Sequence, residues 1–436
     1  MTKFTVIDIP YIDKVSDYYK KLIKLPGFIL LESTDVIRGR YDILSACPYD
    51  VLSTEHFTAN AFLDALQRNI PLVDYQLDLP FQGGGIGFFS YDFGCELAGI
   101  TSDQAALVNL PKAVVGLYDW AIITDHHLKK ISLFAAHTQV ETVAIVEDVL
   151  LRWHSQDCKI EGFVPKKSFT PLVTKAVYEE AFYTIHQALR HGRCYQVNYT
   201  QPFKAAYQGE PWAIYNKIKA YNPVPFSAFM TIGDVSILSF SPERFIKLEQ
   251  GNLLTSPIKG TKPRGASEAE DRALKQLLST CPKNRAENIM IVDLMRNDLS
   301  KIAKVGSVQV PALCAVESYQ AVHHLVSHII AECADIVSPI AAFANCFPGG
   351  SITGAPKREA MHIIAEQEAY QRGVYCGSVG YFSAHGSFDT NIAIRTLIAA
   401  DNSLYLASGG GIVIDSVCEE EYEECFTKIA AILRGL

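Results

Sequence analysis

The chain has 436 residues, of which 49% are hydrophobic and 20% are charged, a composition typical of a folded globular protein. Its formal net charge is -8 and it has no run of lysines and arginines, which argues against nucleic-acid binding and against a basic membrane-binding surface. The length predicts two or three domains or one large composite domain.

The apolar residues and the cysteines exclude further classes. No apolar run approaches the ~20 residues that a membrane helix needs, and the first 22 residues lack the continuous apolar stretch of a signal peptide. The 11 cysteines are scattered without a Cys-x-x-Cys pair, so neither a disulfide framework nor a zinc site is expected. We therefore expect a cytoplasmic protein with no membrane contact.

Residues 1–150 read as short strands and turns, with strands expected at 28–31 and 41–44. The glycine-rich segment 83–91 is expected to form the edge of a sheet, and it lacks the G-x-G-x-x-G spacing of a phosphate-binding loop. The polar connector 155–171 predicts a domain boundary near residue 165. The chain would then divide into an N-terminal region, 1–165, and a C-terminal region, 166–436.

The C-terminal region mixes helices with strands. Tyr178, Phe182, Ile185 and Leu189 recur at helical spacing, and Gly192 is a suitable stop. Further helices are expected at 285–294 and 419–433, and strands at 226–232, 235–240, 245–248, 379–382, 392–398 and 404–407. Since the pattern lacks regular β-α-β alternation, it predicts an α+β fold rather than a doubly wound parallel sheet.

Lys259 lies between rigid and small residues. Pro257 fixes one backbone torsion, and Gly260 lets the chain approach a ligand closely. A lysine held in this way can present its amine as a nucleophile. The alternative is an exposed lysine in a basic turn, because Lys262 and Arg264 follow.

Acidic residues gather on two expected helices. Glu421, Glu424 and Lys428 are spaced by three and four residues, which puts them on one helix face. Glu287 lies on the other acidic helix. Carboxylates arranged like this can hold a hard cation such as Mg²⁺. The alternative for the last helix is a solvated acidic first turn, which the helix dipole favours.

Eight segments, in order, resemble motifs of the chorismate-utilising enzymes, the family of anthranilate synthase component I. The segment Pro-Ile-Lys-Gly-Thr around Lys259 resembles the signature of the aminodeoxychorismate synthase branch, whereas anthranilate synthases carry a small residue in place of the lysine. The match is strong over the C-terminal two-thirds and weak before it. It implies large antiparallel sheets packed face to face, with helices outside. The segments are 195–201, 241–245, 257–261, 286–298, 323–327, 347–357, 392–396 and 409–413.

The resemblance implies roles for individual residues. Glu243 would be the general acid and His324 a second catalytic residue. Gln196 takes the position where relatives that add water to chorismate carry a lysine base, and glutamine cannot act as that base. Ammonia is therefore the expected nucleophile. The residues implied to bind chorismate are Gln196, Thr353, Gly354, Tyr375, Arg395, Gly410, Gly411 and Lys428.

The resemblance also implies a cofactor, a reaction and a partner. Mg²⁺ would be held by Glu287 and Glu424, with Glu421 acting through water, and would serve as a Lewis acid. The reaction would convert chorismate and ammonia to 4-amino-4-deoxychorismate, on the route to p-aminobenzoate and folate, with Lys259 as covalent nucleophile. The ammonia would come from a separate glutamine amidotransferase subunit in a heterodimer. The alternative within the family is anthranilate synthase component I.

Glu32, Ser33, Pro225 and Phe226 resemble the tryptophan pocket of anthranilate synthase, and whether this chain binds tryptophan stays open.

A pyridoxal-phosphate enzyme with Lys259 as the Schiff base would need a phosphate-binding glycine loop before a helix, and the sequence has no convincing one. A catalytically inactive homologue would have lost residues such as Glu287, Glu424 or Arg395, and all three are present.

Overall fold

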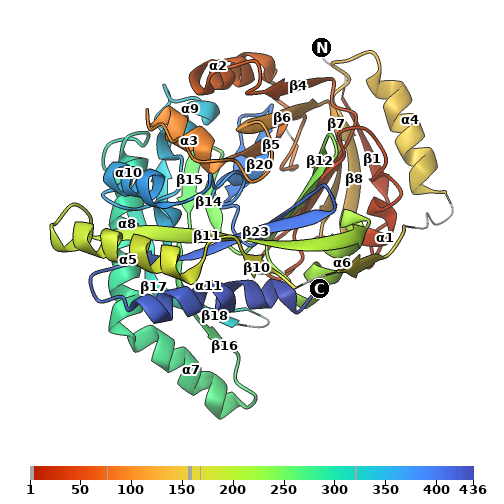
Figure 1. Ribbon diagram of the computed structural model, residues 1–436. Coiled ribbons are helices and arrows are strands. Elements are labelled where there is room, and N and C mark those ends of the chain that lie inside the picture. Colours follow the sequence, from red (N-terminus) through yellow and green to blue (C-terminus); the bar gives the residue numbers. More distant parts are fainter. Residues whose placement is uncertain (1–3, 76, 156–159, 167, 320–321) are drawn as a thin grey trace.

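The computed structural model describes residues 4–75, 77–155, 160–166, 168–319 and 322–436. Two large antiparallel sheets form the centre of the molecule, and the helices lie around them (Figure 1). The α+β fold expected from the sequence is confirmed. In the described part of the chain, no helix combines the length and the apolar character that a membrane span requires.

The first sheet has 13 strands and takes them from both ends of the chain. Its order is β1-β8-β7-β3-β2-β12-β13-β22-β23-β11-β10, and β9 and β19 also pair with β11. The strands are β1 (Thr5–Ile9), β2 (Ile29–Glu32), β3 (Tyr41–Ser45), β7 (Trp120–Asp125), β8 (Lys130–Ala135), β9 (Phe163–Pro165), β10 (Thr170–Pro171), β11 (Gln196–Gly209), β12 (Phe226–Ile232), β13 (Val235–Ser241), β19 (Gly354–Ala355), β22 (Thr396–Ala400) and β23 (Ser403–Ile412).

The second sheet has 10 strands in the order β16-β18-β15-β14-β21-β20-β5-β6-β4, with β17 paired to β18. Strands from the first 165 residues join both sheets, since β2 pairs with β12 and β5 pairs with β20. The strands are β4 (Asp50–Ser53), β5 (Gly84–Phe89), β6 (Ala113–Tyr118), β14 (Arg244–Glu249), β15 (Asn252–Thr255), β16 (Ile258–Pro263), β17 (Gln309–Ser318), β18 (Val322–Glu332), β20 (Ser378–Ser383) and β21 (Phe388–Asn391).

The helices cover the outside of the sheets, with α11 against β23 and α5, and α8 against β16 and β18 (Figure 1). They are α1 (Ser16–Tyr19), α2 (Ala59–Asn69), α3 (Tyr91–Leu97), α4 (Thr142–Trp153), α5 (Lys175–Arg190), α6 (Pro211–Tyr221), α7 (Glu268–Thr280), α8 (Pro282–Ser300), α9 (Pro339–Cys346), α10 (Lys357–Gln367) and α11 (Cys418–Leu433), with a 3-10 turn η1 (Gly350–Ile352).

Helix α5 shows how local sequence sets an element. The side chain of Thr174 caps its first turn by accepting a hydrogen bond from the amide of Val177. Tyr178, Phe182 and Ile185 are buried at the expected spacing. The helix ends at Arg190, shortly before Gly192, whose φ of +72° suits a glycine.

A cluster of phenylalanines joins β5 and β14 to α9. The ring centroid of Phe343 lies 4.6 Å from that of Phe89 and 5.1 Å from that of Phe347. The ring centroids of Phe347 and Phe245 are 5.8 Å apart. Such aromatic contacts contribute beyond simple burial. They fix the start of the segment 347–356, the loop between α9 and α10, called the α9–α10 loop below.

Three expectations from the sequence were wrong. The segment 83–91 is no sheet edge, because β5 runs between β20 and β6 in the interior of the second sheet. A Cβ at Gly87 would lie 2.0 Å from the carbonyl oxygen of Val114, so this glycine permits close packing of strands. Residues 1–150 contain helices, among them α2 and α4. The strand expected at 392–398 begins only at Thr396, since the residue before it is left-handed.

The connector 155–171 is partly outside the described residues, which omit 156–159 and 167. In its described part, β9 pairs with the far end of β11, through Gly209 and its neighbours. The boundary placed near residue 165 therefore falls at the end of a paired strand, and it stays a prediction.

Candidate active site

Lys259 lies on β16, half-buried, and its Nζ donates a hydrogen bond to the main-chain oxygen of Ser351, 3.2 Å away. The alternative of an exposed lysine in a basic turn was wrong. Burial lowers the pKa of Lys259 below its usual value, although the nearby carboxyls of Glu287 and Glu243 oppose this. Gly260 beside it has a φ of +79°, which a glycine adopts without strain.

Glu243 lies in the turn between β13 and β14 and is 5% exposed. Burial raises the pKa of its carboxyl to about 7, against the lowering effects of a hydrogen bond with the Ser351 side chain and of the charge on Lys259. A carboxyl with this pKa keeps a proton at neutral pH for a large fraction of the time. It can therefore act as a general acid there.

His324 lies on β18 and is buried. Its Nδ1 lies 2.8 Å from the hydroxyl of Thr261, and its ring meets that of Tyr319 edge-on, 4.8 Å between centroids. Burial, followed by the nearby positive charge of Arg395, lowers the pKa of His324 to about 3. The imidazole is therefore neutral at physiological pH and can take part only through hydrogen bonds.

Arg395 lies in the connection between β21 and β22, with a φ of +52°, a left-handed value that is uncommon for a non-glycine residue. Its side chain is half-buried, and in the part of the chain that the structure describes its guanidinium has no hydrogen bond or ion pair. A half-buried guanidinium without an acidic partner suits the carboxylate of a ligand.

The carboxyls of α11 lie beside β23. Glu421 is buried and accepts a hydrogen bond from the hydroxyl of Ser416 at 2.7 Å. Lys428 donates to Glu424 at 2.6 Å and to the main-chain oxygen of Gly409 at 2.8 Å. A Cβ at Gly410 would lie 2.7 Å from Oε2 of Glu421, so a glycine is needed for this close approach.

Glu287 lies on α8 and completes the acidic group. Burial raises the pKa of Glu287, and the charge of Glu424 raises it further, while Lys259 and Lys283 lower it. These effects put Glu287 and Glu424 within reach of each other's charge. Glu287, Glu424 and Lys259 are therefore close enough to shift one another's pKa.

The donor chemistry fits Mg²⁺, which takes one or two carboxylates and keeps several waters. Glu287 on α8 and Glu424 on α11 supply two carboxylates, and Glu421 lies one turn before Glu424 on α11. No group of three or more histidine, cysteine, aspartate or glutamate side chains among the described residues is arranged to enclose a metal ion. Mg²⁺ at this site stays a prediction.

The α9–α10 loop and β11 bring in the remaining predicted residues. Gln196 is fully buried, and neither polar atom of its side chain has a hydrogen-bond partner among the described residues. A Cβ at Gly411 would lie 2.7 Å from Nε2 of Gln196, and Gly354 (φ +146°) pairs with Val197 beside it. An unpaired buried amide is costly, so Gln196 is suited to a polar ligand.

Thr353 and Tyr375 are buried in the same region. The hydroxyl of Thr353 donates to the main-chain oxygen of Gly349 at 3.0 Å, so it is already engaged within the loop. Tyr375 is 8% exposed and lies near Arg372 and Cys425. The Thr353 hydroxyl is therefore not free for a ligand in the way that the Gln196 amide is.

Comparisons with known proteins show the family of the chain. The sequence model of the family described as chorismate binding enzyme matches residues 35–434. The chain belongs to this family. It is 42% identical to aminodeoxychorismate synthase component 1 from Salmonella typhimurium, over 99% of this chain and 98% of that protein. It is 40% identical to the protein of the same name from Escherichia coli K12, over 97% and 96%.

More distant relatives of this chorismate-binding enzyme include anthranilate synthases. It is 33% identical to anthranilate synthase component 1 from Lactococcus lactis, over 86% of this chain and 83% of that one. The solved anthranilate synthase component I from Streptococcus pneumoniae aligns with a TM-score of 0.83 at 30% identity, over 91% and 92% of the two chains. The fold expected from the sequence is therefore confirmed.

Sequence reasoning missed one residue of the candidate site of this enzyme. Ser351 contacts both Lys259 and Glu243, through its main-chain oxygen and its side chain respectively. It lies inside the matched segment 347–357, but nothing in the spacing of that segment shows which of its residues reaches the lysine.

A cavity of about 290 Å³ lies between the two sheets of the chorismate-binding enzyme, apart from the Lys259 group. Glu32, Ser33, Pro225 and Phe226, the residues expected to form a tryptophan pocket, all line it. Its volume is close to the lower end of small-ligand pockets. The four residues therefore line one cavity, and its ligand stays a prediction.

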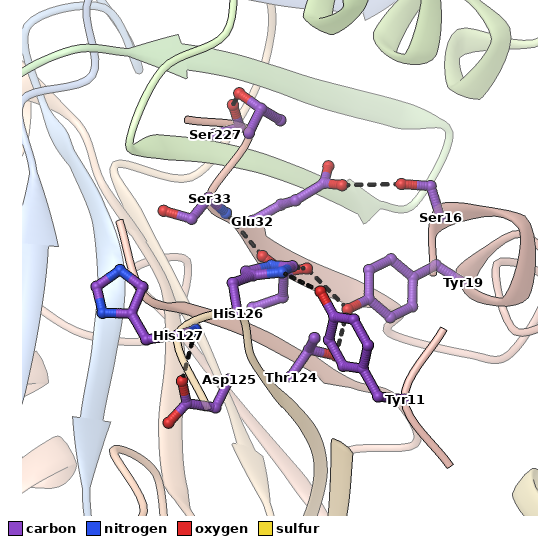
Figure 2. A network of polar contacts seen from close by, with 12 residues as sticks. Tyr11, Ser16, Tyr19, Glu32, Ser33, Thr124, Asp125, His126, His127 and Ser227 are labelled. Carbon is purple, nitrogen blue, oxygen red and sulfur yellow. Dashed lines mark hydrogen bonds and ion pairs between the residues drawn. The ribbon is translucent and has the colours of Figure 1, made fainter. Parts of the chain in front are cut away.

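Glu32 and Ser33, which line this cavity, belong to a network of polar contacts (Figure 2). The amide of Ser33 donates to the buried carboxylate of Asp42 at 2.8 Å, and the hydroxyl of Tyr19 donates to the same carboxylate at 2.8 Å. The imidazole of His126 lies 3.0 Å from it. Glu32 is bound separately, by both Lys219 and Tyr215. These contacts hold the cavity wall in place.

Proposed function

We propose that the chain is the chorismate-aminating component of an aminodeoxychorismate synthase, which converts chorismate and ammonia to 4-amino-4-deoxychorismate and water. The observation that carries the proposal is the pairing of Lys259 with Glu243 at Ser351. The relatives that match nearly the full length of the chain at 39–42% identity bear the name aminodeoxychorismate synthase component 1.

The chemistry proceeds in two displacements. The neutral amine of Lys259 attacks ring carbon 2, the ring double bonds shift, and the hydroxyl on carbon 4 leaves as water with a proton from Glu243. Ammonia then attacks carbon 4, the double bonds shift back, and the amine of Lys259 is expelled from carbon 2. The extra proton of the incoming ammonia returns to the enzyme, which restores Glu243.

The other residues bind and orient the substrate. Arg395 offers its unpaired guanidinium to one carboxylate of chorismate, and Lys428 provides a point charge at the same site. Gln196 turns its unpaired amide toward the substrate. Mg²⁺, held by Glu287 and Glu424 with Glu421 behind them, would supply Lewis-acid polarisation of the substrate when bound.

A separate glutamine amidotransferase subunit supplies the ammonia in this proposal. The relatives carry the words "component 1" in their names, which supports a second component without identifying it. The second candidate function is anthranilate synthesis. It is favoured by the structural similarity to anthranilate synthase component I at 30% identity.

Mass spectrometry of the products separates the two candidates. Purified protein is incubated with chorismate, Mg²⁺ and ammonium, and the product is identified by mass and by fragmentation. Aminodeoxychorismate without anthranilate supports the proposal. Anthranilate as the main product contradicts it, because Lys259 would then not set the outcome of the reaction.

A further inference from the structure

Two basic side chains outside the proposed chemistry hold the α9–α10 loop, one at its start and one at its middle. This loop presents Ser351 to both Lys259 and Glu243. Lys357 lies just after the loop, at the start of α10, and Arg372 follows α10. Each of them bonds main-chain carbonyl oxygens and each is paired with a buried acid.

Lys357 holds the first end of the loop. Its Nζ donates to the main-chain oxygens of Cys346 at 2.9 Å and of Pro348 at 2.8 Å. The third partner is the carboxylate of Asp298, whose side chain is 1% exposed. Asp298 lies near the end of α8, the helix that carries Glu287. Lys357 therefore ties the start of the loop to the helix of the proposed metal site.

Arg372 holds the middle of the loop, at Ile352. Its Nη1 donates to the main-chain oxygen of Ile352 at 2.8 Å, and its Nη2 donates to that of Asn198 on β11 at 2.6 Å. Its side chain is 2% exposed and forms two hydrogen bonds with Glu368, at 2.9 and 2.7 Å. Glu368 in turn accepts hydrogen bonds from the amide and the hydroxyl of Thr200.

Ser351 lies between these two attachments, separated from Pro348 by two residues and adjacent to Ile352. All the residues from Cys346 to Ala355 are buried, so their carbonyl oxygens cannot turn to water if a donor is lost. The position of Ser351 thus depends on hydrogen bonds from Lys357 and Arg372, which have no role of their own in the proposed reaction.

We propose that Lys357 and Arg372 are positioning residues that clamp the α9–α10 loop and so hold Ser351 against Lys259 and Glu243. The clamp places the nucleophile and the acid relative to the substrate. A buried arginine can bind a carboxylate with two parallel hydrogen bonds and still reach two carbonyl oxygens, which a lysine cannot do. Arg372→Lys is therefore a disruptive change although it keeps the charge.

The proposal rests on the proposed function for the roles of Lys259 and Glu243, and its test uses the full-length enzyme with ammonium. Chorismate consumption gives kcat and KM. Calorimetry without ammonium, in the Lys259→Ala background that forms no covalent adduct, gives the dissociation constant of chorismate. Lys357→Met and Arg372→Lys should each lower kcat roughly 100-fold, because small misplacements of reacting groups carry losses of that order. The dissociation constant should change less than about threefold, since Gln196, Arg395 and Lys428 lie outside the loop.

Lys301→Met is the matched control. Lys301 donates to the same carboxylate of Asp298, at 3.0 Å, but contacts no carbonyl oxygen of the loop. Its kcat should stay within about threefold of the wild type. If Lys301→Met lowers kcat as much as Lys357→Met does, Lys357 acts through general stability and the clamp is wrong. The clamp is also wrong if folded Lys357→Met and folded Arg372→Lys both keep normal kcat.

A double mutant that combines Ser351→Ala with Lys357→Met or with Arg372→Lys tests the connection to Ser351. Either combination can be used if the other clamp variant is unstable. Ser351→Ala removes the hydroxyl that bonds Glu243. If the clamp acts through Ser351, the second change should add little to the first, and the losses in kcat should be far from multiplicative. Multiplicative losses would contradict the proposal. If the wild type forms a different amination product, the proposed function fails while the same comparison of kcat still tests the clamp.

Discussion

The amine of Lys259 lies 3.2 Å from the main-chain oxygen of Ser351, whose side chain bonds the carboxyl of Glu243. Burial moves the two pKa values toward each other, lowering that of the lysine and raising that of the glutamate. Both groups are therefore shifted toward their uncharged forms at neutral pH. An uncharged amine is a nucleophile and a protonated carboxyl is an acid, which are the two roles that the reaction needs.

Replacing Lys259 with alanine should abolish the covalent step. We expect turnover of chorismate to fall by roughly 10³-fold or more, because the variant loses the nucleophile itself. Intact-protein mass spectrometry should show an adduct of chorismate mass minus water on the wild type and none on Lys259→Ala. Lys262→Ala, on the same strand, is the control and should keep both turnover and adduct. Normal turnover by Lys259→Ala would rule out the proposed nucleophile.

The protonated fraction of Glu243 should decline as the pH rises through about 7, its pKa, and should fall about tenfold per pH unit above it. Because Lys259 must be uncharged to attack, its neutral fraction changes in the opposite direction, so the Glu243 limb of the profile is the difference between the wild type and Glu243→Gln. Glu243→Gln should lower kcat by about 10²- to 10⁴-fold and remove this limb of the profile. The measurement is kcat between pH 5.5 and 9 at saturating ammonia, with the ammonia concentration corrected for its own ionisation. A Glu243→Gln profile that keeps the limb would assign it to another group.

Glu243 should also make the protein less stable as the pH rises. Its pKa in the folded state is raised from 4.5 to about 7, so the folded state binds more protons than the unfolded state between these values. The stability that protonation gives is present below pH 4.5 and is lost as the pH rises through 7. Since each pKa unit corresponds to about 1.4 kcal/mol, the loss between pH 5 and 8 should be roughly 2–3 kcal/mol.

Glu243→Gln tests this loss, because glutamine has a similar shape and does not titrate. The free energy of unfolding of the variant, relative to the wild type, should rise by roughly 2–3 kcal/mol from pH 5 to pH 8. Denaturant unfolding at several pH values measures the difference. Glu147→Gln, at an exposed position on α4, is the control and should show no such trend. A flat difference for Glu243→Gln would mean that its carboxyl titrates normally.

Local patterns in the sequence were sufficient to predict a helix or strand whose own residues show its periodicity. The buried positions Tyr178, Phe182 and Ile185 gave α5, and the apolar run 226–232 matches β12. The grouping of Glu421, Glu424 and Lys428 on one face of α11 also followed from helical spacing alone. These features depend on neighbours in the sequence, so periodicity reveals them.

The rest depends on contacts between distant segments. Gly87 was expected at the edge of a sheet, but a glycine is required there because the backbone of Val114 approaches it from the neighbouring strand. The left-handed backbone of Arg395 shortens β22, and no sequence rule predicts that conformation for arginine. Ser351 and Lys259 are 92 positions apart, so their contact could not be read from spacing. The site residues came from family resemblance because the fold assembles them from many strands and helices.

The guanidinium of Arg395 should matter for substrate affinity. Arg395→Lys keeps a positive charge but loses the planar pair of donors, so the KM for chorismate should rise by about 10- to 100-fold. A smaller effect on kcat is expected, because this contact is made in the ground state as well as in the transition state. Steady-state kinetics with varied chorismate checks both values. An unchanged KM would show that the unpaired guanidinium faces something other than substrate.

The cavity between the sheets should bind L-tryptophan, the ligand that the resemblance of Glu32, Ser33, Pro225 and Phe226 implies. Bound at about 100 times its dissociation constant, tryptophan should stabilise the protein by about 2.7 kcal/mol, which thermal unfolding detects as a higher Tm. Ala228 also lines the cavity, so Ala228→Leu should reduce its volume and abolish the shift.

L-leucine at the same concentration is the ligand control and should leave Tm unchanged. The effect of tryptophan on kcat then separates a structural ligand from a regulatory one. Binding without inhibition would mean that the ligand only fills the space between β2, β12 and β20, whereas inhibition would require the sheets to transmit its presence to Glu243, the neighbour of the cavity residue Arg244. If millimolar tryptophan leaves Tm unchanged, the cavity is not a tryptophan site in this enzyme.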